Sequence, residues 1–183
     1  MQENKAVQTR LDRVIEWLGD KMSVIFLVIV AISFYEVVMR KIFNAPTIWV
    51  HELAAHLGGF LFIFGGAYAL ATDKHVRVVL LYDKATDKTR AYLNIFHHIM
   101  GIIFSVLMAW ASYIKMKEAW FAPWGEFRIE TTGTVWNSHL GAYLKAVIFI
   151  VMIILTIQFL LHLIVEIKRL SSGYYDQIGG KDV

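Results

Sequence analysis

Four long apolar runs constrain the fold of this sequence more than any other feature. A helix that crosses a bilayer needs about 20 mostly apolar residues. Four runs approach or exceed that length, at residues 22–39, 47–71, 93–114 and 140–165. None carries Asp, Glu, Lys or Arg at its middle, and backbone polar groups in hydrocarbon must bond to one another, as they do in an α-helix. The sequence therefore predicts an all-α integral membrane protein, with residues 1–183 forming one membrane domain of four transmembrane helices.

Composition agrees with a membrane protein and excludes several other classes. Hydrophobic residues make up 57% of the chain and charged residues 18%, against about 25% charged in an ordinary soluble domain. The chain has no cysteine, which excludes disulfides, thiolate metal sites and cysteine nucleophiles. A net charge of +3 is too small to indicate a nucleic-acid partner. Walker, Gly-x-Ser-x-Gly and helical metal motifs are absent from the sequence, so we do not expect an enzyme.

The distribution of Lys and Arg predicts how the helices are oriented. Twelve of the 18 basic residues lie in the N-terminal tail, the loop between the second and third runs, and the C-terminal tail. Because basic residues are enriched in cytoplasmic segments, both termini are predicted to be cytoplasmic, and residues 115–139 form the long outer loop. A cleaved signal peptide is not expected, because the first apolar run continues well past its small residues at Ala31 and Ser33.

Two segments outside the runs have amphipathic patterns. Residues 11–18 place apolar side chains at helical spacing between charged ones, which predicts an amphipathic helix leading into the first run. Beside a membrane this helix would lie flat in the cytoplasmic interface, although packing on protein fits the same pattern. Residues 76–82 are too apolar for open water and are flanked by charges. They predict an amphipathic cytoplasmic arm between the second and third helices, resting on the membrane or on a partner.

Aromatic and small residues indicate where helices meet headgroups and each other. Tryptophan is enriched at membrane–water interfaces, and small residues let helices approach closely in lipid. The predicted interfacial anchors are Trp17, Trp49, Trp120, Trp124 and Trp136. The predicted packing seam on the second helix comprises Ala54, Gly58, Gly65 and Ala69.

A small polar cluster is predicted at the outer ends of the first two helices. Glu36 and Arg40 are spaced i, i+4 and share one helix face. A short turn follows, so Glu52 is expected at a depth similar to Arg40, with His56 one turn deeper. Ionisable residues within a membrane are functional candidates, but near the interface the cluster favours a structural or subunit-contact role. Lys41 is expected to face the lipid headgroups.

The seven histidines leave a haem-binding alternative open. By depth, His51, His56 and His139 gather toward the outer side, whereas His97, His98 and His162 gather toward the inner side. Two axial pairs in a four-helix bundle would make a b-type diheme electron carrier. A stand-alone small exporter using Glu36 is a second alternative. Four spans are too few for the inverted repeats of many secondary transporters, and the lack of a central polar pathway favours an accessory subunit.

One motif resembles a known family. Residues 40–52 read Arg-x-x-Phe-Asn-x-Pro-x-x-Trp-x-x-Glu, which is similar to the first hairpin of the small membrane subunit (DctQ-like) of tripartite ATP-independent periplasmic, or TRAP, transporters. Residues 68–83 also resemble that family's second loop. The chain departs from the family pattern at His51, Val79 and Lys145, so the roles of these three positions do not follow from the resemblance.

The resemblance implies a function, a set of partners and a location. The chain would be a small permease subunit that scaffolds and anchors a large elevator-type subunit in the bacterial inner membrane. The complex would take up an organic anion, a carboxylate or sulfonate, by sodium-coupled transport dependent on a periplasmic binding protein. The implied partners are the large multi-span subunit, the binding protein and membrane lipids. This chain would need no cofactor, because the coupling sodium would bind in the large subunit.

Overall fold

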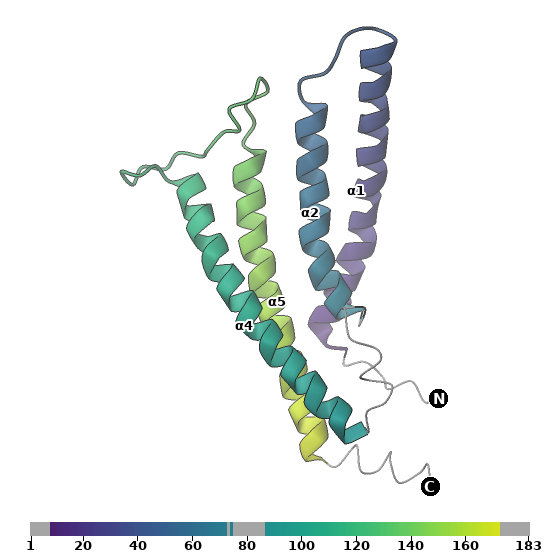
Figure 1. Cartoon of the computed structure of the whole chain (residues 1–183), viewed down its shortest axis with the longest axis vertical. Helices are drawn as coiled ribbons and strands as arrows, with labels where there is room; N and C mark the ends of the chain where they lie inside the picture. The colour runs from purple at the N-terminus through teal and green to yellow at the C-terminus, as the bar shows by residue number, and fades with distance from the viewer. Residues whose placement is uncertain (1–7, 73, 75–86, 173–183) are drawn as a thin grey trace.

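The computed structural model of the chain describes residues 8–72, 74 and 87–172, and consists of four long helices (Figure 1). They are α1 (Arg10–Lys41), α2 (Val50–Ala71), α4 (Asp87–Trp120) and α5 (Leu140–Ser171). All four are long and apolar enough to cross a membrane. The described residues contain no strand beyond one isolated bridge between Phe121 and Phe127. The all-α prediction with four spans is therefore confirmed, and the chain is a multi-pass membrane protein.

Three of the helices extend beyond the apolar runs that predicted them. Helices α1 and α5 have 32 residues each and α4 has 34, which corresponds to about 48–51 Å at 1.5 Å per residue. The hydrocarbon core of a bilayer is only about 30 Å thick. The residues that flank the apolar runs therefore continue the same helices past the membrane core. Their backbone groups keep the same helical hydrogen bonds there.

The amphipathic segment at residues 11–18 forms the first turns of α1 and continues without a break into the apolar run. A capping box begins the helix, because the Thr9 and Asp12 side chains each accept a hydrogen bond from the other residue's backbone N–H. The position of this segment relative to lipid headgroups stays a prediction. The predicted cytoplasmic arm at residues 76–82 lies outside the described residues.

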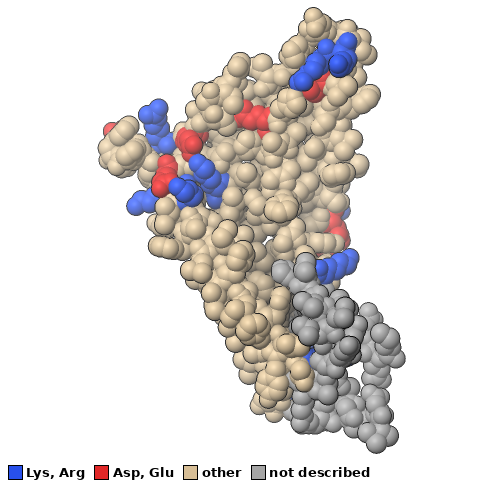
Figure 2. Space-filling model, in the orientation of Figure 1, with Lys and Arg blue, Asp and Glu red and all other residues tan. Residues whose placement is uncertain are grey.

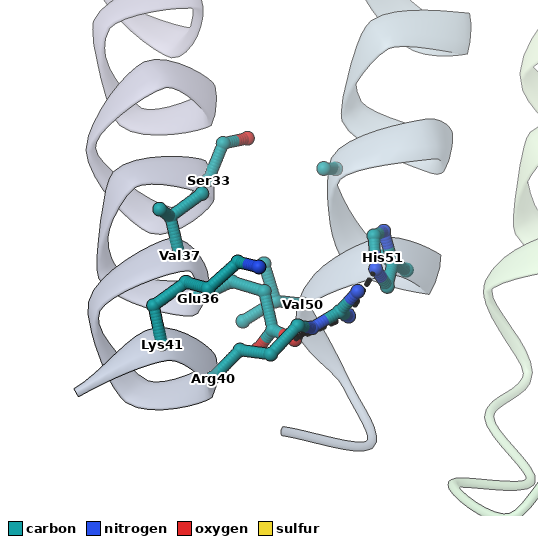
Figure 3. A pocket seen from close by; sticks show the side chains of 8 residues that line it. Ser33, Glu36, Val37, Arg40, Lys41, Val50 and His51 are labelled. Atoms are coloured by element: carbon teal, nitrogen blue, oxygen red, sulfur yellow. Dashed lines mark hydrogen bonds and ion pairs between the residues drawn. The ribbon is translucent and has the colours of Figure 1, made fainter. Parts of the chain in front are cut away.

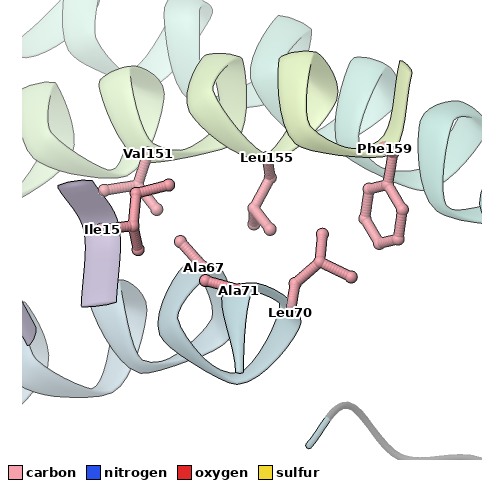
Figure 4. Packing of buried hydrophobic residues seen from close by; sticks show 7 residues of the cluster. All are labelled: Ile15, Ala67, Leu70, Ala71, Val151, Leu155 and Phe159. Carbon is pink, nitrogen blue, oxygen red and sulfur yellow. The ribbon is translucent and has the colours of Figure 1, made fainter. Parts of the chain in front are cut away.

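The helices form two antiparallel hairpins, α1–α2 and α4–α5, joined where α2 packs against α5 (Figure 1). The start of α1 and the end of α5 lie toward the same end of the molecule. The main hydrophobic core is in that half, where three helices meet (Figure 4). Its buried members are Ile15, Ala67, Leu70, Ala71, Val151, Leu155 and Phe159.

The surface between the helix ends is largely apolar. On the face shown in Figure 2, most charged side chains gather over the upper part of the molecule, a small group lies partway down the right edge, and a broad surface without charges lies between and below them. Large apolar side chains stand out from the helices, among them Phe34 on α1, which is 69% exposed, and Phe62 on α2, which is 85% exposed. Exposed apolar surface of this extent is expected of helices that contact lipid or another membrane subunit.

The small residues of α2 are not all packed within this chain. A Cβ atom added at Gly58 or Gly65 would meet nothing within 4 Å among the described residues. The small residues of α2 that the structure buries are Ala67 and Ala71, on a different side of the helix. The predicted packing seam comprises Ala54, Gly58, Gly65 and Ala69. No other helix of the described chain packs against its two glycines. Contact of this stripe with another subunit stays a prediction.

Candidate functional site

We call the end of the molecule that carries the α1–α2 turn the outer end, after the predicted orientation, and the opposite end the inner end. At the outer end a buried carboxylate joins α1 and α2. Glu36 is 3% exposed, and Arg40, four residues later, donates to its Oε1 from Nη2 at 2.7 Å and from Nε at 3.2 Å. The Thr47 backbone N–H donates to Glu36 Oε2 at 3.0 Å, and the Thr47 hydroxyl donates to the same oxygen. Both carboxylate oxygens are therefore used to hold the turn between the two helices against α1.

His51 extends this cluster onto α2. Arg40 Nη2 lies 2.8 Å from His51 Nε2, and because a guanidinium can only donate, this nitrogen accepts and the ring proton is on Nδ1. The Arg40 side chain is 48% exposed and bridges the two helices (Figure 3). The structure thus brings Glu36 and Arg40 together as the spacing predicted, with His51 as an additional member.

Glu52 and His56 belong to a second outer contact, between α2 and the loop before α5. The Glu52 carboxylate accepts a hydrogen bond from the Thr134 hydroxyl at 2.6 Å and another from the Ser138 hydroxyl. It makes no ion pair with Arg40 among the described residues. His56 Nδ1 donates to the Glu52 carbonyl at 2.6 Å. The four predicted polar residues are therefore divided between two contacts, because the outer loop folds back over the start of α2.

The outer loop is fixed by several further polar contacts. Trp120 Nε1 donates to the Ala142 carbonyl at 3.1 Å, and Trp124 Nε1 donates to Glu126 at 2.7 Å. Lys145 of α5 forms an ion pair with Glu130 of the loop. Lys145 is one of the positions that depart from the family pattern, and here it ties the loop to the helix that follows.

The other predicted interfacial anchors have different surroundings. Trp49 stacks on Tyr35, with ring centroids 6.3 Å apart. Trp17 is 61% exposed and Trp136 is partly buried. The structure contains no membrane, so their position at headgroup level stays a prediction.

A buried polar cluster that the sequence analysis missed lies at the opposite end of the bundle. Asp12, near the start of α1, is fully buried. Its Oδ1 accepts from Gln158 Nε2 at 2.9 Å, and its Oδ2 lies 2.8 Å from His162 Nε2. The Gln158 amide also donates to the Ala67 carbonyl at 3.3 Å. One carboxylate therefore connects α1 to α5, and the same glutamine connects α5 to α2.

Further polar residues continue this inner cluster onto α4. The His98 and His162 rings meet edge to face with their centroids 5.5 Å apart, and Asn94 Nδ2 donates to Glu166 Oε1 at 2.9 Å. These two histidines, which are two of the three inner candidates for a haem pair, contact each other directly in this arrangement. The described residues contain no group of three or more His, Asp or Glu side chains arranged to hold a metal ion.

Two sequence signals could have located the inner cluster. Thr-x-x-Asp at residues 9–12 is a capping-box pattern before an apolar run, and Gln158 is a polar residue within the fourth apolar run. Neither signal shows that the two residues meet, because they are 146 positions apart in the chain.

The fold defines the chain as a small multi-pass membrane protein. In the part of the chain that the structure describes, the polar clusters connect helices to one another near their ends. Residues 29–170 match the family described as tripartite ATP-independent periplasmic transporters, DctQ component. The chain belongs to this DctQ family, whose members are components of transporters and not enzymes. The DctQ-like resemblance of its first hairpin is thereby confirmed.

A curated relative gives the same assignment. Over 93 residues the chain is 27% identical to the sialic acid TRAP transporter permease protein SiaT of Haemophilus influenzae (strain 86-028NP). The match covers 51% of this chain and 15% of that protein, so the chain corresponds to a small part of the longer permease.

Proposed function

We propose that this chain is the small permease subunit of a TRAP transporter in the bacterial inner membrane. It would scaffold and anchor the large elevator-type subunit, and a periplasmic binding protein would deliver an organic anion for sodium-coupled uptake. The observation that carries the proposal is the DctQ match over residues 29–170. The similarity to part of a sialic acid TRAP permease supports it.

The geometry supports a static role for this chain. Glu36 uses both carboxylate oxygens to hold the α1–α2 turn, and Asp12 uses both of its oxygens to hold α1 on α5. Carboxylates committed in this way favour a rigid scaffold over a chain that carries an ion itself. The proposed role requires no cofactor, and the coupling sodium would bind in the large subunit.

Copurification tests the assignment. The tagged chain, expressed with the large permease subunit from the same organism, is expected to retain that subunit through solubilisation. With the periplasmic binding protein also present, uptake is expected only when both membrane subunits are expressed. Ion-coupled uptake by this chain alone in liposomes would contradict the accessory role and favour the small-exporter alternative. An intense Soret band in the purified protein would instead favour the diheme carrier.

The charge asymmetry also makes a topological prediction. Reporter fusions at Lys181 are expected to report a cytoplasmic C-terminus, and fusions in the loop at residues 121–139 a periplasmic location, because basic residues favour the cytoplasmic side. Reporters that are active in the cytoplasm and in the periplasm distinguish the two outcomes. A periplasmic C-terminus would overturn the proposed orientation.

Arg40→Ala is expected to reduce the yield of the complex with the large subunit more than Lys41→Ala does. Arg40 neutralises Glu36 and bonds to His51, so its loss leaves a buried carboxylate without its cation and weakens the link between α1 and α2. Lys41 has no ion-pair partner among the described residues. The measurement is copurified complex per cell, together with uptake. Equal results for both variants and the wild type would mean that the Glu36–Arg40 pair does not support assembly.

A further inference from the structure

A cavity of about 300 Å³ lies between the outer ends of α1 and α2 (Figure 3). Its lining comprises Ser33, Glu36, Val37, Arg40, Lys41, Val50, His51 and Ala54. Several of these residues are exposed, including Ser33, Val37 and Lys41 on the α1 side, so the cavity is open to the surroundings of the helices.

The lining changes from cationic to apolar along the helices. Arg40 and Lys41 lie in the last turn of α1, and Ser33, seven residues earlier, lies about 10 Å deeper at 1.5 Å per residue. Ala54 is likewise one turn inside α2 from Val50. The turn between the helices exposes backbone polar groups and must lie outside the hydrocarbon. The cationic end is therefore at headgroup depth, and the small and apolar end faces the upper acyl chains.

The charged side chains that line the cavity have a net positive charge, which one anion would neutralise. Glu36 is neutralised by Arg40 and is bonded to Thr47. The Lys41 ammonium has no ion-pair partner among the residues that the structure describes. Its side chain extends from α1 toward α2 (Figure 3). The charged residues that line the cavity thus sum to one positive charge, which a single phosphodiester would neutralise.

From these three features we infer that the cavity binds a phospholipid of the outer leaflet. Its phosphate would lie against Lys41 and the exposed edge of Arg40, and one acyl chain would pass Val37 and Ala54. Phosphate is recognised by Lys as a point charge and by Arg through directed N–H groups. This site lies within one chain, so it does not depend on the proposed transport role.

Native mass spectrometry of the full chain in detergent tests the site. Phosphatidylglycerol is titrated against wild type, Lys41→Gln, the cavity-filling Val37→Trp and the control Lys117→Gln, a lysine of α4 that does not line the cavity. Lys41→Gln is expected to weaken the tightest lipid binding about tenfold, as for the loss of one charge-assisted hydrogen bond. Val37→Trp should also weaken it, whereas Lys117→Gln should bind as wild type does.

Two further ligands separate the phosphate from the acyl chain. Diacylglycerol, which has no phosphate, and glycerol phosphate, which has no acyl chain, are each expected to bind more weakly than phosphatidylglycerol. Equal lipid binding by wild type, Lys41→Gln and Val37→Trp would overturn the inference, as would glycerol phosphate binding as tightly as the lipid. Loss of the large subunit from Lys41→Gln with unchanged lipid binding would assign the cavity to an acidic side chain of that subunit and overturn the lipid site.

Discussion

Asp12→Ala is expected to lower the thermal stability of the purified chain strongly. The Asp12 carboxylate is fully buried and accepts hydrogen bonds from Gln158, from the Thr9 backbone and hydroxyl, and from His162. A buried donor left without an acceptor costs about 1–3 kcal/mol. The half of the capping box in which the Thr9 backbone N–H donates to Asp12 is lost as well. We expect a clear fall in the melting temperature in detergent, measured by the fluorescence of an attached reporter during size exclusion after heating.

Two matched variants identify the origin of this effect. Asp12→Asn keeps the shape and one acceptor oxygen, so it should be intermediate between wild type and Asp12→Ala. Glu118→Ala removes an exposed carboxylate from α4 and should melt with the wild type, since exposed ion pairs contribute little. If Asp12→Ala and Glu118→Ala melted together, the inner cluster would not stabilise the bundle.

Gly101→Leu is expected to disrupt the α4–α5 hairpin. A Cβ atom at Gly101 would lie 2.5 Å from the ring of Phe159. Phe159 is 4% exposed and packs against the rings of His97 and His98, so it has little space to move away. Overpacking of this kind typically costs about 1–3 kcal/mol, and a full leucine side chain extends beyond the Cβ contact. The expected result is a low yield of monodisperse protein with a reduced melting temperature.

Gly65→Leu is the matched control for this substitution and also tests the predicted seam on α2. A Cβ atom at Gly65 meets nothing within 4 Å of the described chain, so the isolated protein should melt as the wild type does. If the small-residue stripe packs on the large subunit, the same variant should lose the complex on copurification. Full retention of the large subunit would show that this stripe does not face it, whereas loss of stability in the isolated chain would contradict the open geometry.

The membrane-spanning helices could be predicted well because their signal is local. Each apolar run is long enough to identify a helix by itself, and the α1–α2 turn is short enough to make those helices neighbours. Hydropathy did not show where the helices end. Asp87 begins α4 and Ser171 ends α5, both beyond the apolar runs, because a helix can continue in water or against protein once its apolar part is complete.

The polar contacts were predictable only when both partners were close in the chain. Glu36 and Arg40 meet because helix geometry brings residues i and i+4 together. Glu52 bonds to Thr134 and Ser138, which are 82 and 86 residues away. Its partners therefore depend on how the outer loop folds back, which no periodicity specifies.

The surroundings of small residues and of buried polar residues also could not be predicted from the local sequence. The glycines of α2 form a regular stripe, but the stripe does not indicate whether the neighbouring surface belongs to this chain. Asp12 resembled other charged residues of an amphipathic helix, since nothing local distinguishes a carboxylate directed at water from one directed at Gln158.

The contact between the first turn of α1 and the second half of α5 has a consequence for biosynthesis. Because the chain is made from its N-terminus, Asp12 leaves the ribosome long before Gln158 and His162 have been translated. Its carboxylate must stay hydrated until α5 has been inserted, and only then can the first and last helices join. The hydrophobic core that includes Ile15 and Leu155 is completed at the same stage. A nascent chain stopped before α5 would therefore leave this end of α1 exposed, where quality-control proteases could distinguish an unfinished subunit from a finished one.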